Sequence, residues 1–165
     1  MGIGEANEAL WNRALWCLSR RDYGTKELRE RLLRPHPKRE PPSEADVEAA
    51  LLRLTELGLL NDERRAERLA QALARKGWGT RKIQMELRQR GLPEPEAEPE
   101  EGDAQIIARL LRTKYAAKLQ DERGRRLAFQ ALQRRGFSFA DIKTAMAQIG
   151  LDENEKDFEY EELEP

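Results

Sequence analysis

The chain has 165 residues, the size of one ordinary domain or of a short array of repeats. Hydrophobic residues make up 39% and charged residues 37% of it, a composition that excludes one thick core and favours an elongated stack of small helical units. The net charge of −1 hides an uneven distribution, because residues 94–103 carry −6, residues 152–165 carry −7 and the rest carries +12. A basic body with an acidic linker and an acidic tail favours a polyanionic partner, or a partner with an acidic surface.

The N-terminal part of the chain predicts three helices. The first spans about residues 5–21 and buries Leu10, Ala14, Leu15 and Leu18, with Trp11 and Trp16 widening the same face. Gly24 is the predicted N-cap of a second helix over about 25–34, which four prolines follow. Ser43 caps a third helix, whose apolar stripe runs from Val47 to Leu57 and ends at a left-handed Gly58.

The middle of the chain repeats this plan. Asn61 caps a predicted helix over about 62–76, a turn at Gly77-Trp78-Gly79 follows, and a second helix runs over about 80–90. Three prolines interrupt the acidic segment 92–102, which predicts an exposed linker. A third helix is predicted over about 103–115, and Ser138 with Asp141 forms the capping box of the last helix.

Three similar turns indicate internal repetition. Their aromatic residues, Tyr23, Trp78 and Phe137, lie 55 and 59 residues apart, and sliding residues 63–78 forward by 59 places aligns seven identities. We therefore predict an all-α array of tandem three-helix, helix-turn-helix-like repeats without a sheet. Repeat 1 spans 1–60, repeat 2 spans 61–117 with its linker at 92–102, a truncated repeat 3 spans 118–150, and an acidic disordered tail spans 151–165.

No catalytic constellation is present in the sequence. His36 lies alone between prolines, Cys17 lies in an apolar run typical of a core thiol, and no metal-ligand pattern or phosphate loop occurs. We expect no enzymatic activity, no cofactor and no metal. The absence of a signal peptide and of a membrane-spanning segment predicts a cytoplasmic protein with no membrane partner, and we expect a monomer.

Basic residues recur at the ends of the predicted first helices and on the second helices. Cations at a helix C-terminus offset the helix dipole, but a doublet at three equivalent places also favours a binding edge for a filament or a phosphate backbone. On the second helices, a partner-facing surface and an ordinary solvated face are equally supported. The candidate partner- or DNA-binding residues are Arg20, Arg21, Arg75, Lys76, Arg81, Lys82, Arg88, Arg134 and Arg135.

The turn residues have a predicted structural role. An aromatic side chain at each turn is expected to wedge the two helices of its own unit, which contributes burial rather than base stacking. Glycines allow the tight backbone around it. The structural turn residues are Tyr23, Gly24, Gly77, Trp78, Gly79, Gly136 and Phe137.

Over about residues 8–148 the chain resembles the bacterial RecX family, the regulatory proteins that restrain the RecA recombinase. The matching segments include residues 21–23, residues 58–64 and, most strongly, Lys76-Gly77-Trp78-Gly79, with Arg135-Gly136-Phe137 near the C-terminus. The chain departs from the family pattern at Arg65, where an aromatic residue is usual, and at Thr80, where proline is frequent. The change at Arg65 removes an expected core side chain.

The resemblance implies a curved, elongated array and a non-enzymatic regulator. Family members bind the RecA–DNA filament in its groove and inhibit the ATPase, strand-exchange and co-protease activities of RecA, which regulates DNA repair, recombination and the SOS response. Some also bind DNA alone, so single- or double-stranded DNA is a further expected partner. The alternative is a helix-turn-helix-like module that acts on DNA directly. The acidic linker and tail disfavour it, because they repel free DNA.

Overall fold

The computed structural model describes residues 3–38 and 40–151, and within them the chain is all-helical, as predicted. The predicted acidic tail falls almost entirely on residues 152–165, which lie outside the described residues. The described elements are α1 (Ile3–Arg20), α2 (Thr25–Leu33), α3 (Glu44–Glu56), α4 (Asp62–Arg75), α5 (Thr80–Gln89), α6 (Asp103–Arg112), the 3₁₀ helix η1 (Ala116–Gln120), α7 (Glu122–Arg134) and α8 (Phe139–Gln148).

The chain divides into two compact units. The first runs to Leu73 and also includes Ile83–Glu100, and the second contains Ala74–Lys82 and the chain from Glu101 onward. This division is based on contacts and passes through α4 and α5. The predicted repeats are based on sequence pattern and are divided at other residues. The repeat boundaries after residues 60 and 117 stay a prediction.

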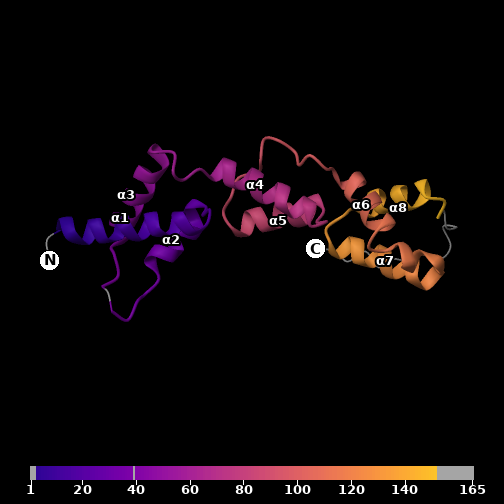
Figure 1. Cartoon of the computed structure of the whole chain (residues 1–165), viewed down its shortest axis with the longest axis horizontal. Helices are drawn as coiled ribbons and strands as arrows, with labels where there is room; N and C mark the ends of the chain where they lie inside the picture. The colour runs from indigo at the N-terminus through magenta and orange to yellow at the C-terminus, as the bar shows by residue number, and fades with distance from the viewer. Residues whose placement is uncertain (1–2, 39, 152–165) are drawn as a thin grey trace. The chain divides into compact units, whose positions relative to one another are not determined.

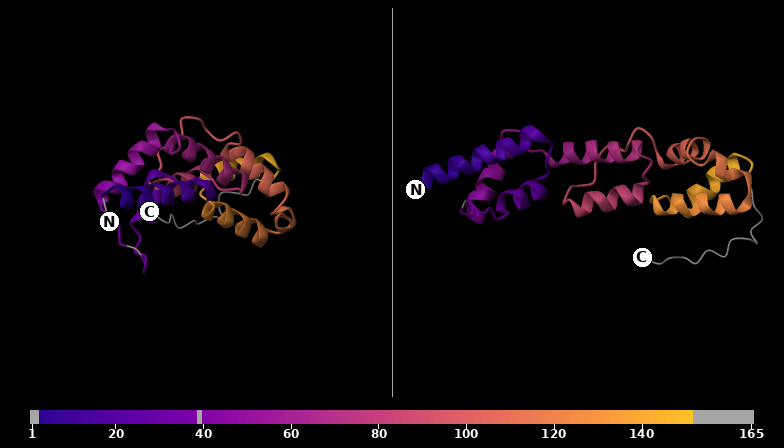
Figure 2. Two further views of the ribbon diagram at one scale, coloured as in Figure 1. Left: turned by 60° about the vertical axis from the view of Figure 1, so that its left-hand side comes forward. Right: turned by 60° about the horizontal axis from the view of Figure 1, so that its bottom comes forward.

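The core of the first unit is built by α1, α2 and α3, which pack together (Figures 1 and 2). Each helix contributes apolar side chains at spacings of three and four residues, the pattern of one buried face. The buried residues of this cluster are Leu10, Ala14, Cys17, Leu28, Leu32, Val47, Ala50, Leu51, Leu54 and Leu60. The core position of Cys17 and the predicted stripe of α3 from Val47 to Leu54 are confirmed, whereas Leu57, the predicted end of that stripe, is 55% exposed.

Trp16 is the main departure from the predicted core. It is 53% exposed, whereas a place on the buried face of the first helix is predicted for it. Ala14 and Cys17 define the centre of that face, and two residues beyond Ala14 a helix has turned by about 200°. Trp16 therefore points away from the core because of the geometry of the helix.

Local capping signals define several helix ends. The Asp46 amide donates to Ser43 Oγ at 3.1 Å, and the Arg64 amide donates to Asn61 Oδ1 at 2.7 Å. Gly58 ends α3 with a φ of 67°, and the Leu59 and Leu60 amides donate back to the Leu54 carbonyl. These caps are confirmed, although only Leu60 is buried and Leu59 is 48% exposed.

Glycine has no side chain to accept a hydrogen bond, and two helices that begin after a glycine, α2 and α5, receive an acceptor from elsewhere in the chain. The first backbone amide of α2, that of Thr25, donates to Asp62 Oδ1 at 2.8 Å, across 37 residues of sequence. The first amide of α5, that of Thr80, donates to Asp103 Oδ1 at 3.0 Å, and its hydroxyl donates to the same oxygen. A carboxylate from a distant segment thus satisfies the first amide of α2 and of α5, since unpaired amides at a helix start are unfavourable.

Two turns of the second unit meet at a separation that only glycine permits. The Gly79 amide donates to the Arg135 carbonyl at 2.8 Å. A Cβ atom at Gly79 would lie 2.6 Å from the Gly136 carbonyl oxygen. Gly77 and Gly136 also have φ values of 82° and 89°, which other residues rarely adopt. The predicted structural role of these glycines therefore has a direct steric cause.

Residues 92–102 are irregular, as predicted, but they are attached at both ends. Leu92 is 6% exposed and the Glu100 amide donates to Gln71 Oε1 at 3.1 Å. Glu101 forms a 2.8 Å ion pair with Arg109, and this hydrogen bond lowers the pKa of Glu101 below its ordinary value. The prediction of a merely exposed linker is thus incomplete, because its ends make specific contacts.

The segment after α6 differs from the prediction. The third helix of repeat 2 was expected to reach Tyr115, but α6 ends at Arg112 and η1 follows. Tyr115 is 4% exposed, and its amide donates to the Leu110 carbonyl. Asp121 then caps α7 by accepting from the Gly124 amide at 2.7 Å. A short 3₁₀ helix has too few residues to show a hydrophobic periodicity, so no pattern in the sequence predicts it.

The Asp103 cap generates a test of the fold. Asp103→Ala should lower the free energy of unfolding by about 0.5–2 kcal/mol, because the Thr80 amide loses its acceptor. Asp103→Asn keeps an acceptor oxygen and removes a charge that is disfavoured there, since burial raises the pKa of Asp103. We expect the Asn variant to stay within about 0.5 kcal/mol of the wild type in urea denaturation. Equal destabilisation by both substitutions would contradict this explanation.

Candidate functional site

The nine predicted binding residues have different exposures. Lys82 and Arg135 are half-buried, and the other seven are exposed. Arg20, Arg21 and Arg88 belong to the first unit, and the other six belong to the second unit. Each unit therefore carries exposed cations of its own.

The doublet Arg20-Arg21 at the end of α1 is organised by aromatic rings. The Arg20 guanidinium lies 5.0 Å from the centroid of the Trp16 ring, and that of Arg21 lies 4.0 Å from the centroid of Tyr23. Arg21 also forms a 4.0 Å ion pair with Glu27. The ring under each guanidinium orients the plane of that group, and its charge stays accessible to a ligand.

The doublet Arg75-Lys76 lies where the backbone of α4 ends, and guanidiniums from elsewhere in the second unit bind that helix end. Arg109 donates to the Ala74 and Arg75 carbonyls at 3.4 and 3.5 Å. Arg135 donates to the Lys76 and Gly77 carbonyls at 3.1 and 2.9 Å. The terminal carbonyls of α4 are thus satisfied by other arginines, and the side chains of Arg75 and Lys76 remain exposed.

The doublet Arg134-Arg135 combines two different environments. Arg134 is exposed, whereas Arg135 is half-buried and also donates to the Tyr115 hydroxyl at 3.2 Å. Arg135 therefore has a packing function that the sequence analysis did not foresee. A binding function for either residue stays a prediction.

The predicted turn aromatics are buried to different degrees. Phe137 is 3% exposed and belongs to the core, as expected. Tyr23 and Trp78 are only half-buried, and Lys82 Nζ lies 5.2 Å from the centroid of the Trp78 ring. Trp78 is thus less buried than a wedge between two helices requires. Arg81 and Arg88 are exposed on α5.

Arg65, the departure from the family pattern, belongs to an ionic cluster around Glu27. Arg65 and Arg90 lie 3.9 and 3.7 Å from the Glu27 carboxylate, which Arg21 also contacts. The Gly24 amide donates to the same carboxylate at 3.3 Å. The Nε atom of Arg65 is buried and has no hydrogen-bond partner. An ionic contact thus replaces the expected aromatic packing, and positive charge exceeds negative charge in this cluster.

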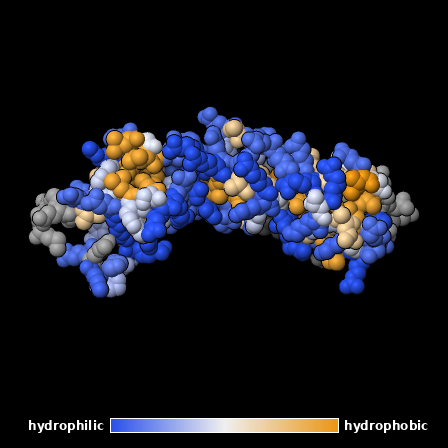
Figure 3. All heavy atoms as spheres, viewed as in Figure 1, coloured by the Kyte–Doolittle hydropathy of each residue, from blue (hydrophilic) through white to orange (hydrophobic). Residues whose placement is uncertain are grey.

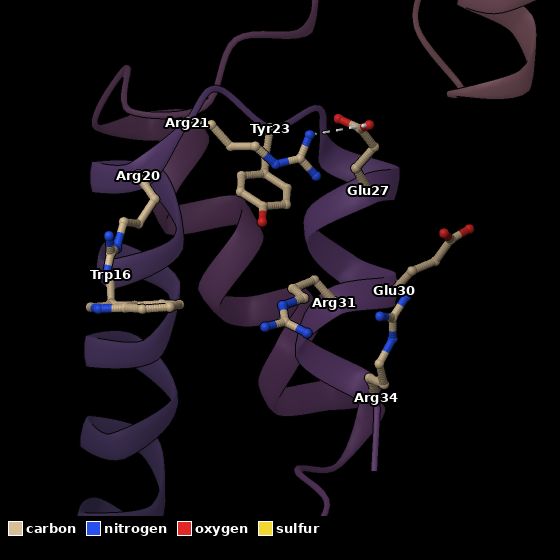
Figure 4. Close-up of a pocket in the computed structure, with 8 residues that line it drawn as sticks. All are labelled: Trp16, Arg20, Arg21, Tyr23, Glu27, Glu30, Arg31 and Arg34. Atoms are coloured by element: carbon tan, nitrogen blue, oxygen red, sulfur yellow. Dashed lines mark ion pairs between the residues drawn. The ribbon is translucent and has the colours of Figure 1, made fainter. Parts of the chain in front are cut away.

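The first unit also contains a pocket that the sequence analysis did not predict, which we call the α1–α2 pocket. It has a volume of about 530 Å³. Figure 4 shows Trp16 and Arg20 on α1, and Arg31 on α2 with Arg34 just after that helix, on opposite sides of the space between the helices. The residues that line it are Trp16, Arg20, Arg21, Tyr23, Glu27, Glu30, Arg31 and Arg34. One sequence feature could have indicated this pocket: at helical spacing, Trp16 lies away from the face formed by Leu10, Ala14 and Cys17.

Apolar side chains also reach the surface. Leu52, Leu57 and Leu59 are 63%, 55% and 48% exposed, and Figure 3 shows an apolar patch over α3. Among the described residues, no group of three or more His, Cys, Asp or Glu side chains is arranged to hold a metal ion. No helix in the described part of the chain is long and apolar enough to cross a membrane.

Fold and surface together define a protein of three-helix units with exposed cations. The family model described as "RecX, second three-helix domain" matches residues 61–98. The chain is 33% identical over 156 residues to Regulatory protein RecX of Halorhodospira halophila, covering 91% of this chain and 94% of the relative. It is also 33% identical over 146 residues to Regulatory protein RecX of Pseudomonas fluorescens, covering 85% and 91%.

Solved structures agree on the fold. The crystal structure of RecX from Lactobacillus salivarius matches with a TM-score of 0.72 at 20% identity, covering 91% of this chain and 100% of that one. A second crystal structure of regulatory protein RecX matches with a TM-score of 0.67 at 21% identity, covering 87% of this chain and 73% of that one. The chain belongs to the RecX family of regulatory proteins.

The two arginines of the third doublet provide a matched test. Arg135→Gln should lower the free energy of unfolding by about 1.5–3 kcal/mol, because charge-assisted hydrogen bonds to the Lys76 and Gly77 carbonyls are lost. Arg134→Gln removes the same charge from an exposed position and should change it by less than about 0.5 kcal/mol. Urea denaturation of both variants checks the difference. Equal stabilities would show that the contacts of Arg135 contribute little.

Proposed function

We propose that this chain is a non-enzymatic regulator that binds the RecA–DNA filament and inhibits the ATPase, strand-exchange and co-protease activities of RecA. The observation that carries the proposal is similarity to proteins named Regulatory protein RecX over nearly the whole chain. This function places the protein in the cytoplasm, in the control of DNA repair, recombination and the SOS response.

The exposed cations support a filament as the partner. Arg75 and Lys76 remain exposed although the end of their helix is already satisfied, so dipole compensation alone does not account for them. The RecA–DNA filament presents phosphates along its DNA, and cations on a binding face gain from the release of counterions. We propose that Arg75, Lys76, Arg81 and Arg134 contribute to the binding face of the second unit. Arg20, Arg21 and Arg88 would do so in the first unit.

Inhibition of RecA gives the direct test of this function. Adding substoichiometric protein should suppress the single-stranded-DNA-dependent ATPase activity of RecA from the same source, because one regulator bound in the groove affects neighbouring subunits. The protein alone should hydrolyse no ATP. RecA should be assembled on the DNA before the protein is added, with filament assembly followed by light scattering. Unchanged ATPase activity at saturating protein would overturn the proposal.

Replacing the central doublet separates binding from stability. The double variant Arg75→Gln/Lys76→Gln should weaken filament binding and flatten its dependence on salt, since two charges that contact phosphates or acids are lost. Its melting temperature should stay close to that of the wild type, because Arg109 and Arg135 still bind the helix end. Lys114→Gln/Arg123→Gln removes two other exposed cations of the second unit and serves as the control. Equal loss of binding in both double variants would mean that only total charge matters.

A further inference from the structure

We propose that the α1–α2 pocket binds one nucleotide of single-stranded nucleic acid, with its base against Trp16 and its phosphate among the arginines. This site goes beyond the proposed regulation of RecA, and its test needs no RecA, although Arg20 and Arg21 belong both to the pocket and to the proposed binding face of the first unit. It also differs from a helix-turn-helix interface, which would read the groove of a duplex.

The chemistry of the lining selects the ligand class. The pocket is lined by four arginines, two aromatic residues and two glutamates, without a single aliphatic side chain. A peptide anchor such as Leu or Ile would find no aliphatic wall there. A nucleotide offers what these groups recognise, because its base has a π-face and its phosphate accepts paired hydrogen bonds from guanidinium.

Trp16 provides the stacking surface. Trp16 is 53% exposed and lines the pocket, so part of its ring is accessible to a ligand. Arg20 lies over this ring and Arg21 over Tyr23, so that guanidinium and aromatic planes are already layered. In Figure 4, Arg31 reaches from α2 toward Trp16. Bases of single strands stack on aromatic rings and on arginine planes of this kind.

The charge of the pocket favours phosphate. Four guanidiniums face two carboxylates, and one of these, Glu27, is already contacted by Arg65 and Arg90 from outside the pocket lining. The excess positive charge is therefore available to an anion. A single strand fits better than a duplex, because a paired base is stacked on its neighbours and cannot offer its face. The volume of about 530 Å³ lies within the range of about 300–1,000 Å³ typical of ligand pockets.

Substitution of Trp16 tests the stacking. Binding of a fluorescein-labelled oligo(dT) to the full chain, without RecA, is followed by anisotropy. Trp16→Leu should weaken binding about 5- to 150-fold, the effect of losing one stacked base, whereas Trp16→Phe keeps an aromatic face and should retain most of the affinity. Melting temperatures of both variants check that they fold. Equal affinities of the wild type and the folded Leu variant would overturn the proposal.

Ligand variants test the two parts of the nucleotide separately. An abasic oligonucleotide of the same length should bind the wild type as weakly as oligo(dT) binds Trp16→Leu. Arg31→Gln should reduce the slope of log K against log salt by about 0.7, the value for one phosphate of a single strand. Arg53→Gln, an exposed arginine of α3 outside the pocket, should leave the Trp16 effect unchanged.

Three outcomes would overturn the site. They are an abasic strand that binds as tightly as oligo(dT), a duplex of equal length that binds more tightly, and displacement of oligo(dT) by poly-glutamate at matched charge. The last result would assign the pocket to an acidic peptide. Because these measurements omit RecA, their failure leaves the proposed regulation of RecA standing. Conversely, loss of RecA inhibition would not affect them.

Discussion

Several helix ends of this protein depend on charged side chains supplied by distant parts of the sequence. In the first unit, Asp62 accepts the first amide of α2 and Arg13 donates to the Arg31 and Leu32 carbonyls at its other end. In the second unit, Asp103 holds the start of α5, and Arg109 and Arg135 hold the end of α4. Short helices are marginal alone, so these contacts complete them.

This arrangement accounts for the unusual composition of the chain. A protein with 37% charged residues cannot rely on a large apolar core. Here some of the charged side chains contribute stability that a larger apolar core would otherwise supply. Each carboxylate or guanidinium at a helix end offsets the helix dipole and satisfies backbone groups that would otherwise be unpaired. Such contacts are also directional, which fixes the position of one helix end against another segment of the same unit.

Arginine consequently has two functions that the sequence does not distinguish. Arg134 and Arg135 are adjacent and chemically identical, yet one is exposed and the other binds the carbonyls of a turn 58 residues earlier. The same division separates Arg109, which binds the end of α4, from Arg75, which is exposed. The exposed cations are the part of the charge that helix ends do not use, and the α1–α2 pocket brings four arginines together beside Trp16.

The sequence by itself determined the helices, their apolar faces and their local caps, because these depend on residues three or four positions apart, as at Ser43, Asn61 and Ser138. It also indicated the family, through turn residues in a fixed order. Only the tertiary structure decided which cations are exposed, that η1 follows α6, and that Trp16 borders a pocket. The partial burial of Arg135 arises from contacts with Tyr115 and Lys76, 20 and 59 residues away, and the pocket arises from the packing of α1 against α2, so no local pattern encodes either.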